Sequence, residues 1–199
     1  MMQENEGFDR GWYAGPVGWL GVDGDGELCV ALRCGIVDRT QASLFAGCGI
    51  VADRRIHRGA EGAAGDIGHI VVTDHEDVVC RCGNTGCLEA MAAGPAISEK
   101  AMQAAKNGLS PLLLQMVESN GGYLRPEDVN AACREGDQAA LEVIRSSGQM
   151  VGDVLAGLVN FFNPSHIFIG GGITNFGNHL LVAIRRAVLR RSLPLATRN

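Results

Sequence analysis

The pattern of hydrophobic and polar positions divides the chain into two parts. Residues 10–52 hold short apolar runs separated by turn signals such as the Asp-Gly-Asp-Gly run at 23–26. Short apolar runs bounded by glycine and aspartate are typical of β-strands. We therefore expect two or three antiparallel strands and no helix here, with strands at Leu28–Arg33 and Ala42–Ala46.

Helical signals dominate after Arg54, following a strand candidate at Ile67–Val72. Proline is tolerated in the first turn of a helix, because the amide hydrogen it lacks has no partner there. Prolines therefore predict helices from Gly94-Pro95 to about Ala105, from Ser110-Pro111, and from Pro126, where acids in the first turn favour the helix dipole.

A long helix is expected from an Asp137 cap to about Phe162. Its apolar positions recur at helical spacing and predict a buried stripe of Leu141, Ile144, Met150, Val151, Leu155 and Val159. The next apolar run, Ile167–Ile169, predicts a short buried strand that enters a glycine turn before a last helix at about His179–Arg191. This order of elements predicts an α/β unit with a parallel-type strand.

Charge and composition exclude some functions. The net charge is -5 and the pI about 5.5, which argues against broad nucleic-acid binding, because phosphate attraction needs clustered lysine and arginine. Basic residues gather only near the end, at 185–191, and we interpret them as a solvated helix face. The polar, acidic start is unlike a signal peptide and no apolar run is long enough for a bilayer span. We expect a cytoplasmic protein without membrane contact.

Seven cysteines in a reducing compartment indicate metal or redox chemistry before disulfides. Three of them, Cys80, Cys82 and Cys87, fall within eight consecutive residues. Gly83 and Gly86 allow the backbone between them to fold tightly and turn the three sulfurs inward. The alternative is a set of buried thiols without a metal.

A zinc ion held by these thiolates needs a fourth ligand to complete a tetrahedron. His69 and His75 are both near enough in sequence. We favour His69, at the end of an extended segment, because His75 lies in the acidic stretch 74–77, which is typical of a solvated loop. Four protein ligands leave no position for water, so the predicted zinc (Zn2+) is structural and not hydrolytic.

Residues 59–70, Gly-Ala-Glu-Gly-Ala-Ala-Gly-Asp-Ile-Gly-His-Ile, precede the Cys-x-Cys-Gly-x-x-Gly-Cys-Leu-Glu run at 80–89. This combination resembles the signature of the ROK family, which comprises repressors, unassigned open reading frames and sugar kinases. The resemblance continues through residues 160–172 and 191–198. It implies a partial actin-like, ribonuclease-H-like ATPase domain with a structural zinc, a small-molecule sugar as ligand, and a homodimer.

The same resemblance places the sugar contacts on Asp66, His69 and Glu89. The family usually has glutamate at the first position, so Asp66 is one methylene shorter; Asp66 as a turn residue and Glu89 as a surface helix acid are the alternatives. Gly170, Gly171 and Gly172 resemble the family's adenosine-side motif, with a tight turn as the alternative.

A ROK kinase carries an Asp-x-Gly-x-Thr phosphate loop and a catalytic aspartate, and a ROK repressor carries a helix-turn-helix. We find no counterpart of these features, so we expect no catalytic residue and no DNA contact from this segment, and ATP, if bound, is not expected to be used. The first hypothesis is a remnant of a sugar-responsive transcriptional regulator, because the tail at 190–198 looks more like the regulators. The second is an ATP-dependent hexose kinase, for glucose or an N-acetylhexosamine.

The front of the chain resembles another family. Residues 10–19, 24–27, 31–33 and 44–53 look like the C-terminal part of isochorismate synthases, in the chorismate-binding family. The resemblance would place a chorismate carboxylate on Arg33, but the family's magnesium-binding glutamate has no counterpart, so we interpret Arg33 as a strand-edge surface charge. An isochorismate synthase fragment is the third hypothesis.

The segment Gly49–Asp53 suits both families. We interpret it as the junction of two joined fragments. The predicted organisation is a β-rich fragment at 1–53 followed by an incomplete ROK sugar-binding domain at 54–199.

Overall fold

The computed structural model describes four strands within residues 16–45, and residues 49–52, 55–74, 77–170 and 172–197. The chain forms two compact units, Met1–Asp66 and Ile67–Asn199.

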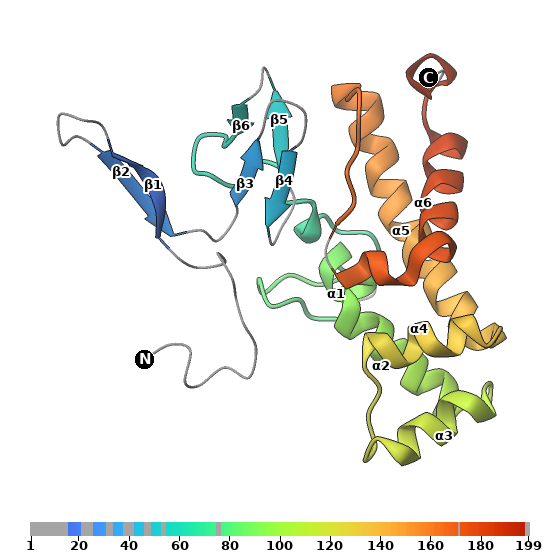
Figure 1. The fold of residues 1–199 in the computed structure, drawn as a ribbon. Helices are drawn as coiled ribbons and strands as arrows, with labels where there is room; N and C mark the ends of the chain where they lie inside the picture. The colour runs from blue at the N-terminus through green and yellow to red at the C-terminus, as the bar shows by residue number, and fades with distance from the viewer. Residues whose placement is uncertain are drawn as a thin grey trace. The chain divides into compact units, whose positions relative to one another are not determined.

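The first unit contains antiparallel two-stranded hairpins (Figure 1). The paired strands are β1 (Pro16–Leu20) with β2 (Gly26–Val30), β3 (Cys34–Val37) with β4 (Ala42–Phe45), and β5 (Ile50–Ala52) with β6 (Arg55–His57). Two or three antiparallel strands were predicted between residues 10 and 52, whereas the described residues form five strands there, paired antiparallel. The strand after Arg54 was not predicted, because the hydrophobic pattern there shows no clear alternation.

The described part of the second unit is helical. Its α-helices are α1 (Leu88–Ala92), α2 (Gly94–Lys106), α3 (Pro111–Ser119), α4 (Pro126–Arg134), α5 (Gln138–Phe162) and α6 (Gly177–Arg191). Short 3-10 helices lie at η2 (Ile67–His69), η3 (Gly172–Phe176) and η4 (Pro194–Thr197). The predicted helix starts at the three prolines are confirmed.

Local hydrogen bonds explain where two of these helices begin. The Ser110 hydroxyl accepts from the Leu113 amide at 2.9 Å, and the Asp137 carboxylate accepts from the Ala140 amide at 2.8 Å. The same Ser110 hydroxyl donates to Asp137 at 2.6 Å, so the caps of α3 and α5 share one network. Each cap satisfies a backbone amide that has no partner inside its helix.

Helices α5 and α6 pack closely and run parallel (Figure 1). A Cβ added at Gly148 would lie 2.7 Å from the Ala183 Cβ, and one at Gly152 would lie 2.6 Å from the Ala187 Cβ. Both glycines thus allow a close approach that a side chain would prevent. Further along α5, the side-chain amide of Asn160 donates to the Arg191 carbonyl and accepts from the Leu193 backbone amide. These two bonds join the ends of the two helices.

The hydrophobic core of the helical unit draws on α2 to α6. Its fully buried large apolar side chains are Ile97, Leu113, Val129, Ile144 and Leu180. Of the predicted α5 stripe, Ile144, Leu155 and Val159 are buried, whereas Leu141, Met150 and Val151 are only partly buried. Small residues of α5, such as Gly148 and Gly152, take the remaining buried positions because α6 lies so close there.

Two predicted strands are wrong. Ile167–Ile169 has no strand conformation, and Phe168 is 70% exposed. A strand needs a neighbour for its backbone hydrogen bonds, and the described strands of this chain pair only within their own hairpins. The predicted α/β unit therefore has no strand at Ile167–Ile169, although Ile169 is partly buried against the core.

Ile67–Val72 was likewise predicted as a strand. It begins instead as the 3-10 helix η2, and only Val71 makes an isolated antiparallel bridge, to Cys87.

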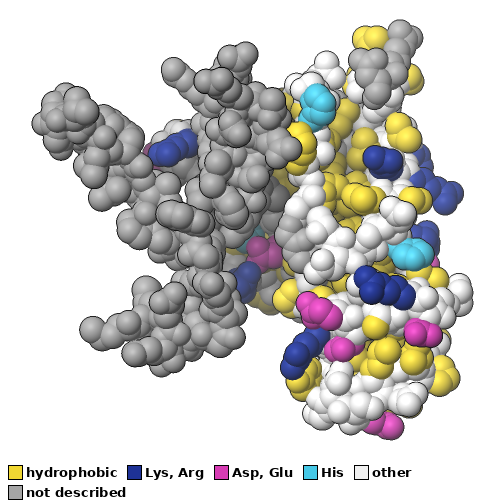
Figure 2. All heavy atoms as spheres, viewed as in Figure 1, with side chains coloured by type: hydrophobic (Ala, Val, Ile, Leu, Met, Phe, Trp, Pro, Cys, Tyr) yellow, Lys and Arg dark blue, Asp and Glu magenta, His cyan; other side chains and the backbone are white. Residues whose placement is uncertain are grey.

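Figure 2 shows hydrophobic side chains lying among charged ones on the visible face of the helical unit. Within the described ranges, each helix is too short or too polar to serve as a bilayer span.

Candidate metal centre

A short cysteine loop connects η2 with α1 in the second unit. An isolated bridge between Val79 and Thr85 closes it, and the Cys80 amide donates to the Asn84 carbonyl at 2.7 Å. The Gly86 carbonyl accepts from the Val72 amide at 2.8 Å, which ties the loop to the segment after η2. The loop thus contains a small hairpin, and the base of this hairpin is hydrogen-bonded to the segment that follows η2.

Glycine is required at Gly86 for two reasons. Its φ is +67°, in the left-handed region, and an added Cβ would lie 2.1 Å from the Thr73 carbonyl oxygen. Gly83 also has a positive φ, of +92°, but a Cβ there would meet nothing within 4 Å. The prediction that both glycines allow the loop to fold tightly agrees with these conformations.

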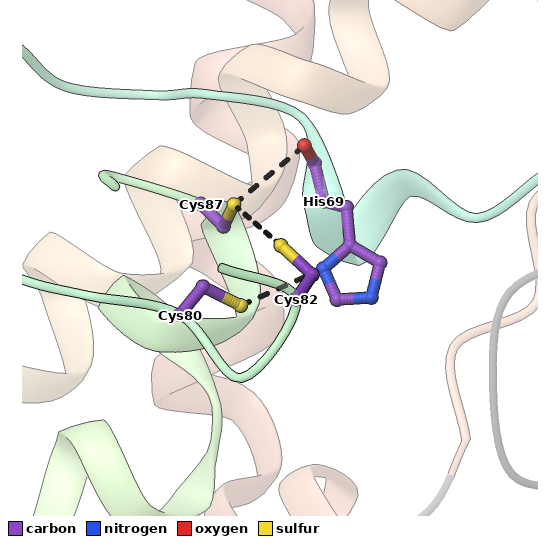
Figure 3. A group of neighbouring side chains, drawn as sticks. All are labelled: His69, Cys80, Cys82 and Cys87. Carbon is purple, nitrogen blue, oxygen red and sulfur yellow. Dashed lines mark hydrogen bonds between the residues drawn. The ribbon is translucent and has the colours of Figure 1, made fainter. Parts of the chain in front are cut away.

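The loop brings four potential metal ligands together (Figure 3). One ligand atom from each of His69, Cys80, Cys82 and Cys87 lies within 4.8 Å of all the others. The Cys82 and Cys87 sulfurs are 3.7 Å apart, and the Cys80 sulfur lies 3.6 Å from the His69 Nδ1. His75, the alternative fourth ligand, lies outside the described residues.

The Cys82–Cys87 and Cys80–His69 separations match the edges of a zinc tetrahedron. With sulfurs about 2.3 Å and a nitrogen about 2.0–2.1 Å from the metal, the sulfur–sulfur edge is about 3.8 Å and the sulfur–nitrogen edge about 3.6 Å. The chemistry of the donors fits as well, because three thiolates and an imidazole form a common structural zinc set. The residues present therefore suit the metal that the sequence predicted.

The thiols of the cluster differ in their electrostatic surroundings. A hydrogen bond from the Asn84 backbone lowers the pKa of the exposed Cys82 thiol. Desolvation raises the pKa of the buried Cys87 thiol to about 12, and hydrogen bonds with Cys82 and Cys80 add to the increase. Three sulfurs this close repel one another as thiolates, so a bound cation is the natural compensation for their charge.

The His69 ring has one nitrogen directed to the sulfurs and one directed away from them. Nδ1 faces Cys80, whereas Nε2 points away from the three cysteines (Figure 3). His69 is partly buried and ends η2, so its backbone belongs to the segment that the loop pins down. The two nitrogens can therefore serve two different partners.

Glu89 lies in the first turn of α1, two residues after Cys87. Its carboxylate accepts from the Arg81 guanidinium at 2.7 Å. Arg81 belongs to the loop itself, between two of the cysteines, and sequence reasoning gave it no role. The signal available was a basic residue inside a cysteine motif that ends in an acid.

The remaining predicted site residues are less informative. Asp66 is partly buried and is the last residue of the first unit. Gly170 is exposed and Gly172 begins η3, whereas Gly171 lies outside the described residues. Arg33 lies outside them too. The roles predicted for these residues stay predictions.

Comparison with known proteins gives two family matches. The ROK family model matches residues 45–194, and the model for chorismate binding enzymes matches residues 1–58. The matches overlap at 45–58, a segment that contains the predicted junction at Gly49–Asp53. The proposed domain boundary itself stays a prediction.

Curated relatives include both kinases and repressors. A glucokinase of Halalkalibacterium halodurans is 34% identical over 88% of this chain and 51% of its own length. The DNA-binding transcriptional dual regulator NagC of Escherichia coli is 35% identical over 74% of this chain and 34% of its own. The chain thus spans about half or less of the curated relatives it matches.

Solved structures give the same result. A ROK family transcriptional regulator, a homologue of the E. coli MLC protein, matches with 35% identity and a TM-score of 0.67 over 78% of this chain and 37% of its own. A ROK family glucokinase from Streptomyces griseus, in complex with glucose and AMPPNP, matches with 32% identity and a TM-score of 0.64 over 71% and 46%. These likenesses support the predicted kinase-like fold, although the described residues here are mostly helical. The ROK family model matches most of the length of this chain, and the chain therefore belongs to the ROK family.

Proposed function

We propose that this chain is a sugar-binding ROK protein of the regulator type, in which a structural zinc holds the residues that contact the sugar. The observation that carries the proposal is the convergence of His69, Cys80, Cys82 and Cys87 within 4.8 Å, with Glu89 on the helix that follows directly. A metal there would fix the ends of the segment that carries both proposed contacts.

The proposed zinc would be held by three thiolates and His69 Nδ1. It would supply charge compensation for the thiolates and a fixed orientation of the imidazole. A ligated Nδ1 leaves the proton on Nε2, the nitrogen that points away from the cysteines. His69 can then donate a hydrogen bond to a sugar hydroxyl.

The Glu89 carboxylate supplies the complementary function. Carboxylates accept hydrogen bonds from hydroxyl groups, and such charge-assisted bonds are stronger than neutral ones. Glu89 is a third exposed, so ligand can reach it. The ROK resemblance also predicts Asp66 as an acceptor, but Asp66 belongs to the first unit, and the site proposed here consists of His69 as donor and Glu89 as acceptor.

We favour a regulator over a kinase. Phosphoryl transfer needs a base that deprotonates the sugar hydroxyl and groups that hold the phosphates, and we place no residue of this chain in either role. The likeness of the tail at 190–198 to ROK regulators supports the same choice. A homodimer is part of the proposal, and the mass of the protein in solution tests it.

The test measures metal and sugar separately. We expect about one zinc per chain by mass spectrometry, lost in Cys82→Ser. We expect glucose, N-acetylglucosamine or N-acetylmannosamine to raise the melting temperature, and Glu89→Gln to reduce that shift while keeping the zinc. Glucose and N-acetylglucosamine follow the names of two relatives, and N-acetylmannosamine is the stereoisomer of N-acetylglucosamine that differs at one carbon.

Chorismate serves as the control ligand. A shift with chorismate and none with the sugars would contradict the proposal and favour the synthase fragment. ATP-dependent phosphorylation of any of the three sugars would favour the kinase alternative.

A further inference from the structure

The ion pair between Arg81 and Glu89 joins the cysteine loop to the helix that follows it. The Arg81 Nη2 lies 2.7 Å from the Glu89 Oε1. Arg81 is 89% exposed and Glu89 33% exposed, so the pair lies at the surface of the helical unit. Exposed pairs contribute little to folding stability because water competes for both charges. A role other than stability is therefore worth considering.

Both residues of the pair are close in sequence to the candidate metal ligands. Arg81 lies between Cys80 and Cys82, and Glu89 follows Cys87 by two residues. Both partners thus belong to the segment that carries the three clustered cysteines. In addition, the Lys100 ammonium donates to the Met91 carbonyl at 2.6 Å, which holds the end of the short helix α1 against α2.

We propose that Arg81 is a positioning residue for sugar binding. The guanidinium occupies the Oε1 atom of Glu89 and fixes the rotamer of the side chain, which leaves Oε2 to accept from a sugar hydroxyl. A carboxylate held in one orientation binds more tightly, because the entropy of ordering it is not lost on binding. This inference rests on the proposed sugar-binding function, and it adds the residue that couples the metal loop to Glu89.

The experiment is a double-mutant cycle measured by titration calorimetry, with glucose and N-acetylglucosamine as probes. We expect Arg81→Ala to raise the Kd about tenfold, as for the loss of one charge-assisted hydrogen bond. Zinc content and melting temperature should stay unchanged. Arg81→Lys should recover only part of the affinity, because an ammonium lacks the planar fork of the guanidinium. In the Glu89→Gln background, Arg81→Ala should have no further effect.

Arg145→Ala is the matched control, since Arg145 is another exposed arginine in an ion pair, with Glu142 on α5. It should leave the Kd unchanged. An unchanged Kd in Arg81→Ala overturns the role of Arg81 while the proposed function stands. An equal loss in the Glu89→Gln background also overturns it, because Arg81 would then contact the sugar directly. Absence of sugar binding by the unmodified protein overturns the proposed function and this role together.

Discussion

The helical core and the cysteine loop of the second unit are stabilised in different ways. The core buries large apolar side chains completely, including Ile97, Leu113 and Ile144. In the loop region, by contrast, Val71 and Val79 are 55% and 67% exposed. Burial of large apolar side chains therefore contributes less to the loop than to the helices. The loop depends on backbone hydrogen bonds and, in our proposal, on zinc.

The difference predicts that metal removal and core mutation affect separate parts of the protein. The proposed zinc would bind only the folded ligand cluster, so its binding energy would stabilise the loop. None of the four proposed zinc ligands belongs to the hydrophobic core cluster. Three experiments test whether the loop and the core behave independently.

The largest effect is expected from a strong zinc chelator. Structural zinc sites contribute on the order of 10 kcal/mol of apparent binding energy, so the amides of residues 79–87 should lose their protection from hydrogen exchange. The amides in the middle of α5 should keep theirs. Loss of protection in both regions would show that the loop and the core unfold as one unit.

A core truncation should show the opposite pattern. Ile144 is fully buried in α5, and Ile144→Ala should lower the free energy of unfolding by about 2–5 kcal/mol through lost apolar contacts and a cavity. The zinc content of the folded Ile144→Ala variant, measured at denaturant concentrations below its unfolding transition, should equal that of the unmodified protein. Val182→Ala is the control, because Val182 is 63% exposed and its truncation should cost less than about 0.5 kcal/mol. Comparable losses in the two variants would contradict the assigned core.

The smallest effect compares two glycines of the loop. Gly86→Ala should destabilise the loop by about 1–3 kcal/mol, since the alanine must adopt a positive φ and also displaces the Thr73 carbonyl. Gly83→Ala imposes only the positive φ, because the space around it is open. Zinc affinity by competition with a chromophoric chelator should fall further for Gly86→Ala. Equal affinities would mean that the Thr73 contact has no role in holding the loop.

Much of the helical unit could be predicted from the sequence because its signals are local. Proline in a first turn and a capping aspartate at Asp137 act within a few residues, and each predicted helix starts near its signal. The convergence of Cys80, Cys82 and Cys87 was also predictable, since two glycines within eight residues allow the backbone to turn back and bring the three thiols together.

The failures have a common origin in long-range pairing. An apolar run such as Ile167–Ile169 has the pattern of a buried strand, but a strand exists only when another chain segment accepts its hydrogen bonds. The close contact of α5 with α6 was likewise missed, because Gly148 and Gly152 gain their meaning only from the alanines opposite them. The pattern of α5 alone predicted large residues at its interface.

By itself, the sequence determined where the helices begin, which cysteines gather, and which family the chain belongs to. Tertiary structure decided that His69 presents Nδ1 to the thiols and that Arg81 pairs with Glu89. The reason is physical. Helix starts and short loops depend on the torsion angles of adjacent residues, whereas a side-chain contact depends on how separate segments are packed against each other.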